Sequence, residues 1–286
     1  MRSAAFRRGG EMVRSPWKIF GIWLLVVVAL VGVVAPFIWI VGVSLKYQIQ
    51  ILMAQFPFDP TWFNYQEVLF GKSSEFLLNA RNSLIVALIS TACVLVVGTL
   101  AAYSLSWRRW SPLFSSVFLA WTLIFNIIPP ITLVGPWFLI FRELGLYNTL
   151  FGLTLTHIVI NLPMTIWLMM TAFGNIPREL EQAAIIDGCR RTTAFRRVLL
   201  PLTTPGLIAS GLLAFVFSWS EFGIALNLTA TETMTIPVAI ANYAGQYEIR
   251  HGEMAAASVL SAVPAIILMF VGQKFIVRGL TAGAVK

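Results

Sequence analysis

Six stretches of the sequence, each 20 to 34 residues long, carry no charged side chain, and they constrain the fold more than any other feature. They are residues 19–45, 82–107, 110–141, 144–177, 198–220 and 254–273. About 20 apolar residues cross the hydrocarbon core of a bilayer, and none of these stretches is long enough for two crossings plus a turn. The pattern therefore predicts an all-α integral membrane protein with six transmembrane helices.

The composition supports a membrane protein. The chain has 286 residues, of which 58% are hydrophobic and only 11% are charged, whereas soluble domains average about 25% charged residues. So few charges exclude a soluble globular protein and a disordered chain. Two cysteines, Cys93 and Cys189, are too few for a disulfide scaffold and indicate no metal site.

The basic residues predict the orientation of the chain. The first stretch is too long for a signal-peptide core and lacks a cleavage pattern, so we expect it to remain as a helix. With the N-terminus inside, fifteen Lys and Arg residues fall in cytoplasmic segments. The other five fall outside: Lys46, Lys72, Arg81, Arg142 and Arg250. Because cytoplasmic loops carry the excess of basic residues, both termini are expected in the cytoplasm.

The long loop after the fourth stretch is predicted to contain two short helices. Pro177 suits the first turn of a helix with Asn175 as its cap, and Glu179 and Glu181 suit the positive helix end. Gly188 is expected to end this helix in the left-handed conformation.

A second helix is expected to start at Thr192 or Thr193 and to end at Pro201. Its apolar positions follow helical spacing, with Arg196 and Arg197 turned away; they are Phe195, Val198, Leu199 and Leu202. Two interpretations remain open. The loop is either a compact knob for a partner protein or an interfacial elbow whose arginines meet anionic headgroups.

The residues of this loop resemble a known signature. Glu181-Gln182-Ala183-Ala184, followed by Gly188 and by Leu200-Pro201, is similar to the loop of binding-protein-dependent ABC importer permeases. The segments Trp219–Phe222, Leu228–Thr231 and Gly279–Lys286 resemble the carbohydrate-uptake branch of that family, the maltose-transporter type. The resemblance covers essentially the whole chain.

The resemblance implies a type I ABC importer permease fold with cytoplasmic N and C termini. It divides the chain into a basic cytoplasmic tail (1–18), a six-helix permease domain (19–276) and a cytoplasmic C-terminal tail (277–286). The segment 174–201 would be the coupling loop, seated in a groove of a separate ATPase.

The implied ATPase contacts lie in that loop and in the tail. In the loop they are Glu181, Gln182, Ala183, Ala184, Asp187, Gly188 and Pro201, and in the tail Gly279, Thr281 and Gly283. The chain departs from the family pattern at Gln182, where the family has glutamate. Either Glu181 supplies the charged contact, or the interface with the ATPase is less electrostatic than usual.

Four residues in the spans are candidates for a substrate pathway: Asn126, Asn161, Trp219 and Glu221. Glu221 is the one charged residue within a predicted span, and polar side chains there are expected to face the interior. It lines a pathway or pairs with a neighbouring helix or subunit. Asn126 and Asn161 precede prolines that free backbone groups, although bonding between helices explains each of them as well. His157 is expected to be a hydrogen-bonded packing residue.

The outer segment from Thr229 to Glu253 resembles the loop that reaches the substrate-binding protein. Its amides and aromatic rings suit sugar hydroxyls; they are Asn242, Tyr243, Gln246 and Tyr247. An ordinary structured loop explains each of them equally well.

The predicted function is that of a permease subunit, which moves a carbohydrate or polyol into the cytoplasm by ATP-driven alternating access. The implied partners are a second permease subunit, two ATPase copies, an extracytoplasmic substrate-binding protein and the bacterial inner membrane. The chain is expected to have no catalytic or metal site and no cofactor of its own, since ATP and Mg would bind the ATPase. The alternatives are a stand-alone channel or ion-coupled carrier and, last, an intramembrane enzyme.

Overall fold

A computed structural model describes residues 16–108, 110–245 and 249–281, with the side chains of 16, 18, 19 and 274–281 left out of the description. Within these residues the secondary structure is helical, apart from one isolated antiparallel bridge between Ala244 and Ile249. The helices are α1 (Pro16–Ser44), α2 (Gln48–Leu52), α3 (Phe63–Phe70), α4 (Phe76–Trp107), α5 (Pro112–Ile127), η1 (Pro130–Leu133), α6 (Val134–Glu143), α7 (Leu150–Gly174), α8 (Glu179–Ile186), α9 (Arg191–Ala194), η2 (Phe195–Leu199), α10 (Leu200–Leu202), α11 (Thr204–Trp219), α12 (Gly223–Leu228), α13 (Ile236–Asn242) and α14 (His251–Thr281).

Four helices are long and apolar enough to cross a membrane: α1, α4, α7 and α14. Two further candidates are bent pairs, which bring the number to six if each pair is one span. In one pair α5 meets η1 and α6 at 95°, and in the other the α9–α10 segment meets α11 at 72°. The expectation of one helix per uncharged stretch is therefore wrong for 110–141. Pro129 and Pro130 break that stretch, because proline lacks the amide that a continuous helix needs.

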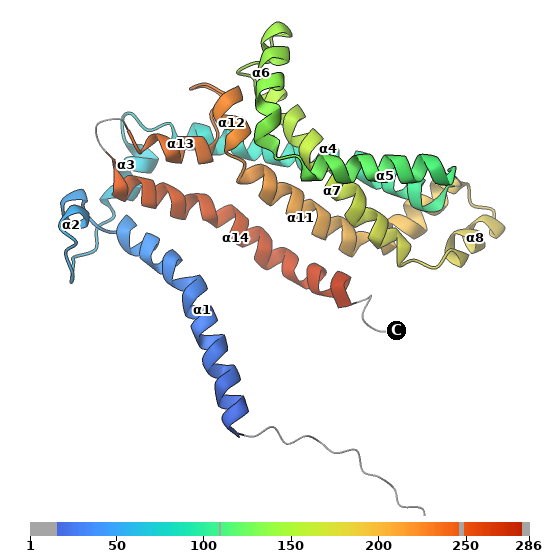
Figure 1. Cartoon of the computed structure of the whole chain (residues 1–286), viewed down its shortest axis with the longest axis horizontal. Helices are drawn as coiled ribbons and strands as arrows, with labels where there is room; N and C mark the ends of the chain where they lie inside the picture. Colours follow the sequence, from blue (N-terminus) through green and yellow to red (C-terminus); the bar gives the residue numbers. More distant parts are fainter. Residues whose placement is uncertain (1–15, 109, 246–248, 282–286) are drawn as a thin grey trace, which may run out of the picture.

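Helices α4, α7 and α11 form the centre of the bundle, and α14 packs beside α11 (Figure 1). Close approach of α4 to α7 depends on Gly98, where an added Cβ would lie 2.8 Å from Thr165 Cγ2. Small residues permit such packing between helices in lipid. Val86 and Val94 on α4 and Met169 on α7 are buried in this centre.

The C-terminal part of helix α1 packs on α14, and its N-terminal part diverges from the other helices (Figure 1). Its side chains from Phe20 to Val41 are exposed, and most of them are large and apolar. Proline lies within α1, α7 and α14, at Pro36, Pro163 and Pro264. The apolar surface of α1 fits a lipid or protein environment, since water would not stabilise it.

The outer segments contain helices that the charge pattern did not reveal. The segment between α1 and α4 holds α2 and α3, and the segment between α11 and α14 holds α12 and α13. Asn64 of α3 donates to the carbonyls of Ser44 and Lys46, both at 2.8 Å, which attaches α3 to the end of α1.

Candidate functional site

Glu221 lies in the break between α11 and α12. Its Oε1 accepts a hydrogen bond from Ile224 N at 2.8 Å, and its Oε2 accepts one from Ala225 N at 3.0 Å. The carboxylate thus accepts hydrogen bonds from two backbone amides at the start of α12. The N–H groups in the first turn of a helix have no carbonyl partners within the helix. The short chain between Trp219 and Gly223 is non-helical, which turns this side chain back over the next helix.

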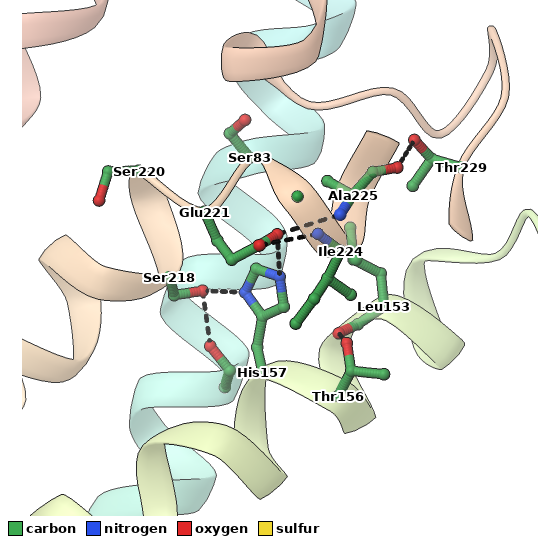
Figure 2. Close-up of polar contacts among 12 residues, drawn as sticks. Ser83, Leu153, Thr156, His157, Ser218, Ser220, Glu221, Ile224, Ala225 and Thr229 are labelled. Atoms are coloured by element: carbon green, nitrogen blue, oxygen red, sulfur yellow. Dashed lines mark hydrogen bonds and ion pairs between the residues drawn. The ribbon is translucent and has the colours of Figure 1, made fainter. Parts of the chain in front are cut away.

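A buried polar chain of side chains from α4, α11 and α7 approaches the same carboxylate. Ser90 Oγ lies 3.1 Å from Ser218 Oγ, which lies 2.5 Å from His157 Nδ1. On the other side of the ring, His157 Nε2 lies 3.8 Å from Glu221 Oε2 (Figure 2). His157 is hydrogen-bonded and fully buried, which confirms the expectation of a packing role. The sequence did not indicate that it would adjoin Glu221.

Three of the four predicted pathway residues line one cavity. Asn126 of α5, Asn161 of α7 and Glu221 border a cavity of about 370 Å³. Its other walls are Pro130, Ile160, Met164 and Phe217. A few polar groups on an apolar wall are typical of small-molecule sites.

The two asparagines have partly satisfied amides. Asn126 Nδ2 donates to Thr122 O, and Asn161 Nδ2 donates to His157 O, both at 2.9 Å. Both bonds lie within single helices, so neither joins one helix to another. The fourth residue, Trp219, does not line the cavity. Its Nε1 donates to Ser261 O at 2.9 Å, and its ring stacks on Phe215.

The coupling loop has the predicted glycine turn. Gly188 has φ +84°, its N–H bonds Ile185 O at 3.0 Å, and Cys189 N–H bonds Ala184 O at 2.9 Å. This pair of bonds is the Schellman motif, which satisfies the last carbonyls of α8. The expected start of this helix, at Pro177 with Asn175 as its cap, is wrong, however. Asn175 ends α7, and α8 begins at Glu179 without a side-chain cap.

The tip of α8 presents small and apolar residues. Gln182 and Ala183 are exposed, whereas Ala184 is buried. Ile186, at the end of the helix, is 84% exposed. The resemblance did not single out Ile186, although its place just before the predicted glycine turn could have indicated an exposed apolar tip.

Glu181 is held within the chain. Its Oε1 accepts from Tyr103 OH at 2.7 Å, and the same hydroxyl accepts from Arg108 Nη2 at 2.8 Å. The Tyr103 ring packs on Phe173 and Phe195 at the coupling-loop end of the bundle. The loop is therefore joined to the end of α4 through Tyr103, and Arg178 Nη2 adds a hydrogen bond to Ser106 O at 3.0 Å.

The second part of the loop is one continuous helical segment that crosses Pro201. It runs from α9 through the π-helical turn η2 into α10, and it bends at Thr203. The helix ends at Leu202, one residue after Pro201, which agrees with the expected end to within the precision of helix boundaries. Leu199 is buried as expected, but Leu202 is 50% exposed.

The outer loop forms a second, more polar cavity of about 230 Å³. Asn242 and Tyr243 line it together with Asn79 and Glu67. Arg250 lies over the Tyr243 ring at 4.9 Å and forms an ion pair with Glu253 at 2.9 Å. Burial raises the pKa of the Tyr243 phenol; Glu253 adds to the rise and Arg250 opposes it.

The remaining predicted contacts cannot be placed. Gln246, Tyr247 and Gly283 lie outside the described residues. Gly279 and Thr281 belong to the last turns of α14, where the backbone is described and the side chains are not.

Comparison with known proteins identifies relatives across the chain. Residues 94–282 match the family "Binding-protein-dependent transport system inner membrane component". The sulfoquinovosyl glycerol transport system permease protein SmoH of Agrobacterium fabrum is 36% identical over 263 residues, covering 91% of each chain. The trehalose transport system permease protein SugB of Mycobacterium tuberculosis is 36% identical over 269 residues, covering 92% of this chain and 97% of the relative.

A solved structure shares the fold. A chain of a bacterial ABC transporter involved in the import of the acidic polysaccharide alginate superposes with a TM-score of 0.77 at 24% identity. The match covers 91% of this chain and 97% of that one. At this identity the likeness concerns the fold alone.

Proposed function

Because the chain belongs to the binding-protein-dependent transport system inner membrane component family, it is a membrane permease subunit of an ABC importer, and we propose that it passes a carbohydrate or polyol through the cavity at Glu221. The observation that carries this proposal is the meeting of Asn126, Asn161 and Glu221 in one cavity. Amide and carboxylate oxygens accept hydrogen bonds from sugar hydroxyls.

Six membrane crossings with both termini in the cytoplasm fit this role. Each bent pair then counts as one span, and the break inside a span is tolerated where it borders a cavity rather than lipid. The break between α5 and η1 borders such a cavity, since Pro130 lines it. The excess of Lys and Arg in the inner segments supports the orientation.

The coupling loop would transmit movement from two copies of an ATPase. The exposed tip of Gln182, Ala183 and Ile186 suits a groove on a partner, since small residues allow close docking and Ile186 adds apolar area. Since Glu181 already accepts a bond from Tyr103, we favour an interface in which Gln182 makes a neutral contact. Asp187, Gly188 and Pro201 would shape this knob.

ATP-driven closure of the ATPase would rock the spans between outward and inward states. Helix α8 is attached to α4 through Tyr103, and η2 packs against α8. The knob and the central helices would thus move together. The cavity at Glu221 would open to alternate sides as they move. The tail around Gly279, Thr281 and Gly283 would add contacts to the ATPase.

The outer cavity at Asn242 and Tyr243 would face the substrate-binding protein, together with Gln246 and Tyr247. A second, homologous permease subunit would complete the pathway. The relatives' names give different substrates, sulfoquinovosyl glycerol and trehalose. A disaccharide, an oligosaccharide, a polyol or a glycerol derivative therefore all suit this chain.

Reconstitution tests this proposal. The chain is expected to co-purify with an ATPase and a second permease, and the complex in proteoliposomes should accumulate at least one labelled carbohydrate from a panel only when ATP is supplied. A purified chain that transports by itself without ATP would contradict the proposal.

A further inference from the structure

A groove beside the coupling loop runs between α4 and the segment from α9 to α11. Its volume is about 540 Å³, within the roughly 300–1,000 Å³ of ordinary ligand sites. It is separate from the cavity at Glu221, with which it shares no lining residue. One part of the groove is apolar and the other is basic.

The apolar part follows α4 into the membrane region. It is formed by Leu95, Val96, Leu100, Phe195, Leu200 and Leu207. Val96 and Leu100 are 61% and 52% exposed, so this wall is uncovered in the chain. Leu95 and Arg108 are thirteen residues apart, about 20 Å along a helix, slightly more than the roughly 15 Å of hydrocarbon in one leaflet.

The basic part lies at the end of α4 and the start of α9. Arg108, Arg191 and Arg196 all line the groove there. Arg108 donates to Tyr103 OH and lies over its ring at 5.0 Å. Within the described part of the chain, the ion pair between charged side chains joins Arg250 to Glu253, so no carboxylate is paired with these three arginines.

We propose that this groove binds an anionic phospholipid, such as phosphatidylglycerol, from the leaflet on the side of the coupling loop. The three guanidinium groups bind the phosphate through charge-assisted hydrogen bonds. One acyl chain covers the apolar wall down to Leu95. Free phosphate leaves that wall bare, and an apolar helix of another subunit leaves three arginines unpaired in the membrane interface. The lipid supplies a phosphate to the arginines and an acyl chain to the apolar wall.

Lipid bound here also supports the coupling loop. Arg108 bonds the hydroxyl that in turn bonds Glu181 of α8. A phosphate beside Arg108 and Arg191 therefore fixes α4 and α9 on either side of that tyrosine. The proposal concerns lipid binding and is measured without transport, so it can fail while the importer function stands.

The assembled importer in nanodiscs that contain phosphatidylglycerol and phosphatidylethanolamine provides the test. After extraction, native mass spectrometry counts the phosphatidylglycerol molecules retained per complex. The double variant Arg191→Gln/Arg196→Gln is expected to retain it at least about tenfold more weakly, since two charge-assisted partners of the phosphate are lost. Arg197→Gln is the matched control, because Arg197 is adjacent and exposed but does not line the groove, and it is expected to retain the lipid.

A second variant separates lipid from free phosphate. Leu100→Trp fills the apolar wall and keeps every charge, so it is expected to weaken phosphatidylglycerol retention, and added inorganic phosphate is expected not to displace the lipid. The proposal is overturned if the double variant retains the lipid like the wild type. The proposal is also overturned if Arg197→Gln loses as much phosphatidylglycerol as the double variant. It is overturned as well if Leu100→Trp retains the lipid and inorganic phosphate displaces it.

Discussion

His157 Nε2 lies 3.8 Å from Glu221 Oε2, across the junction between α7 and the break that separates α11 from α12. This distance is longer than the donor–acceptor distance of a direct hydrogen bond. The ring is held on its other side by Ser218, so its edge faces the carboxylate without bonding it. The same carboxylate caps α12 and lines the cavity. The start of α12 and the proposed pathway therefore depend on one side chain.

Glu221→Gln is expected to lower uptake about tenfold while the complex still assembles. The carboxylate serves two amides with two oxygens, whereas glutamine has one acceptor oxygen, and a hydrogen bond to a charged group contributes about 1.5–3 kcal/mol. Uptake in proteoliposomes measures the effect. Glu232→Gln, in the exposed outer loop, is the control and should behave as wild type; equal uptake in Glu221→Gln would remove this residue from the pathway.

Ser218→Ala is expected to destabilise the chain by about 1–3 kcal/mol, because it leaves His157 Nδ1 buried without a partner. Thermal unfolding in detergent should show a melting temperature lower by about 2–4 °C per kcal/mol. Ser220→Ala removes a similar hydroxyl that is exposed and bonds only the Val216 carbonyl. A melting temperature equal to that of the control would show that the buried chain adds no stability.

Tyr103→Phe tests the connection between the bundle and the coupling loop. It removes the hydroxyl that bonds Glu181 and Arg108 and keeps the ring that packs on Phe195. We expect less substrate transported per ATP hydrolysed, by a few-fold, from the loss of about 1–3 kcal/mol in charge-assisted bonds. Tyr147→Phe is the control because its ring contacts Phe138 at the outer side. A ratio unchanged from wild type would argue against this connection.

Ile186→Ser is expected to weaken ATPase binding at least about tenfold. Ile186 is 84% exposed at the end of α8, and burial of such a side chain at an interface contributes about 1.5–3 kcal/mol. Affinity of the purified ATPase for the permease pair in nanodiscs gives the measurement. Leu202→Ser alters an exposed leucine outside the α8 tip and should bind normally. Unchanged binding by Ile186→Ser would place the ATPase contact elsewhere.

The uncharged apolar stretches correctly predicted the positions of the long helices. A helix that crosses a membrane must have both a minimum length and an apolar composition. The positive φ of Gly188 was also predicted, since few other residues adopt it readily. The local pattern predicted the wrong role for Asn175, which lies at the end of the preceding helix instead of capping α8.

Other features arise from tertiary contacts that no local pattern encodes. The sequence singled out Glu221, Asn126 and Asn161 because each is polar where lipid-facing residues are apolar. It did not reveal the approach of His157 to Glu221, because these residues are 64 positions apart and belong to different helices.

The most direct test of the central claim is ATP-driven uptake by the reconstituted complex with a substitution at Gly188. Its φ of +84° excludes a β-branched side chain without strain, so Gly188→Val is expected to abolish uptake while the chain remains in the membrane. Gly188→Asn, which tolerates this conformation, should retain most of it. Normal ATP-driven uptake by Gly188→Val would contradict the account that this turn couples ATP hydrolysis to transport.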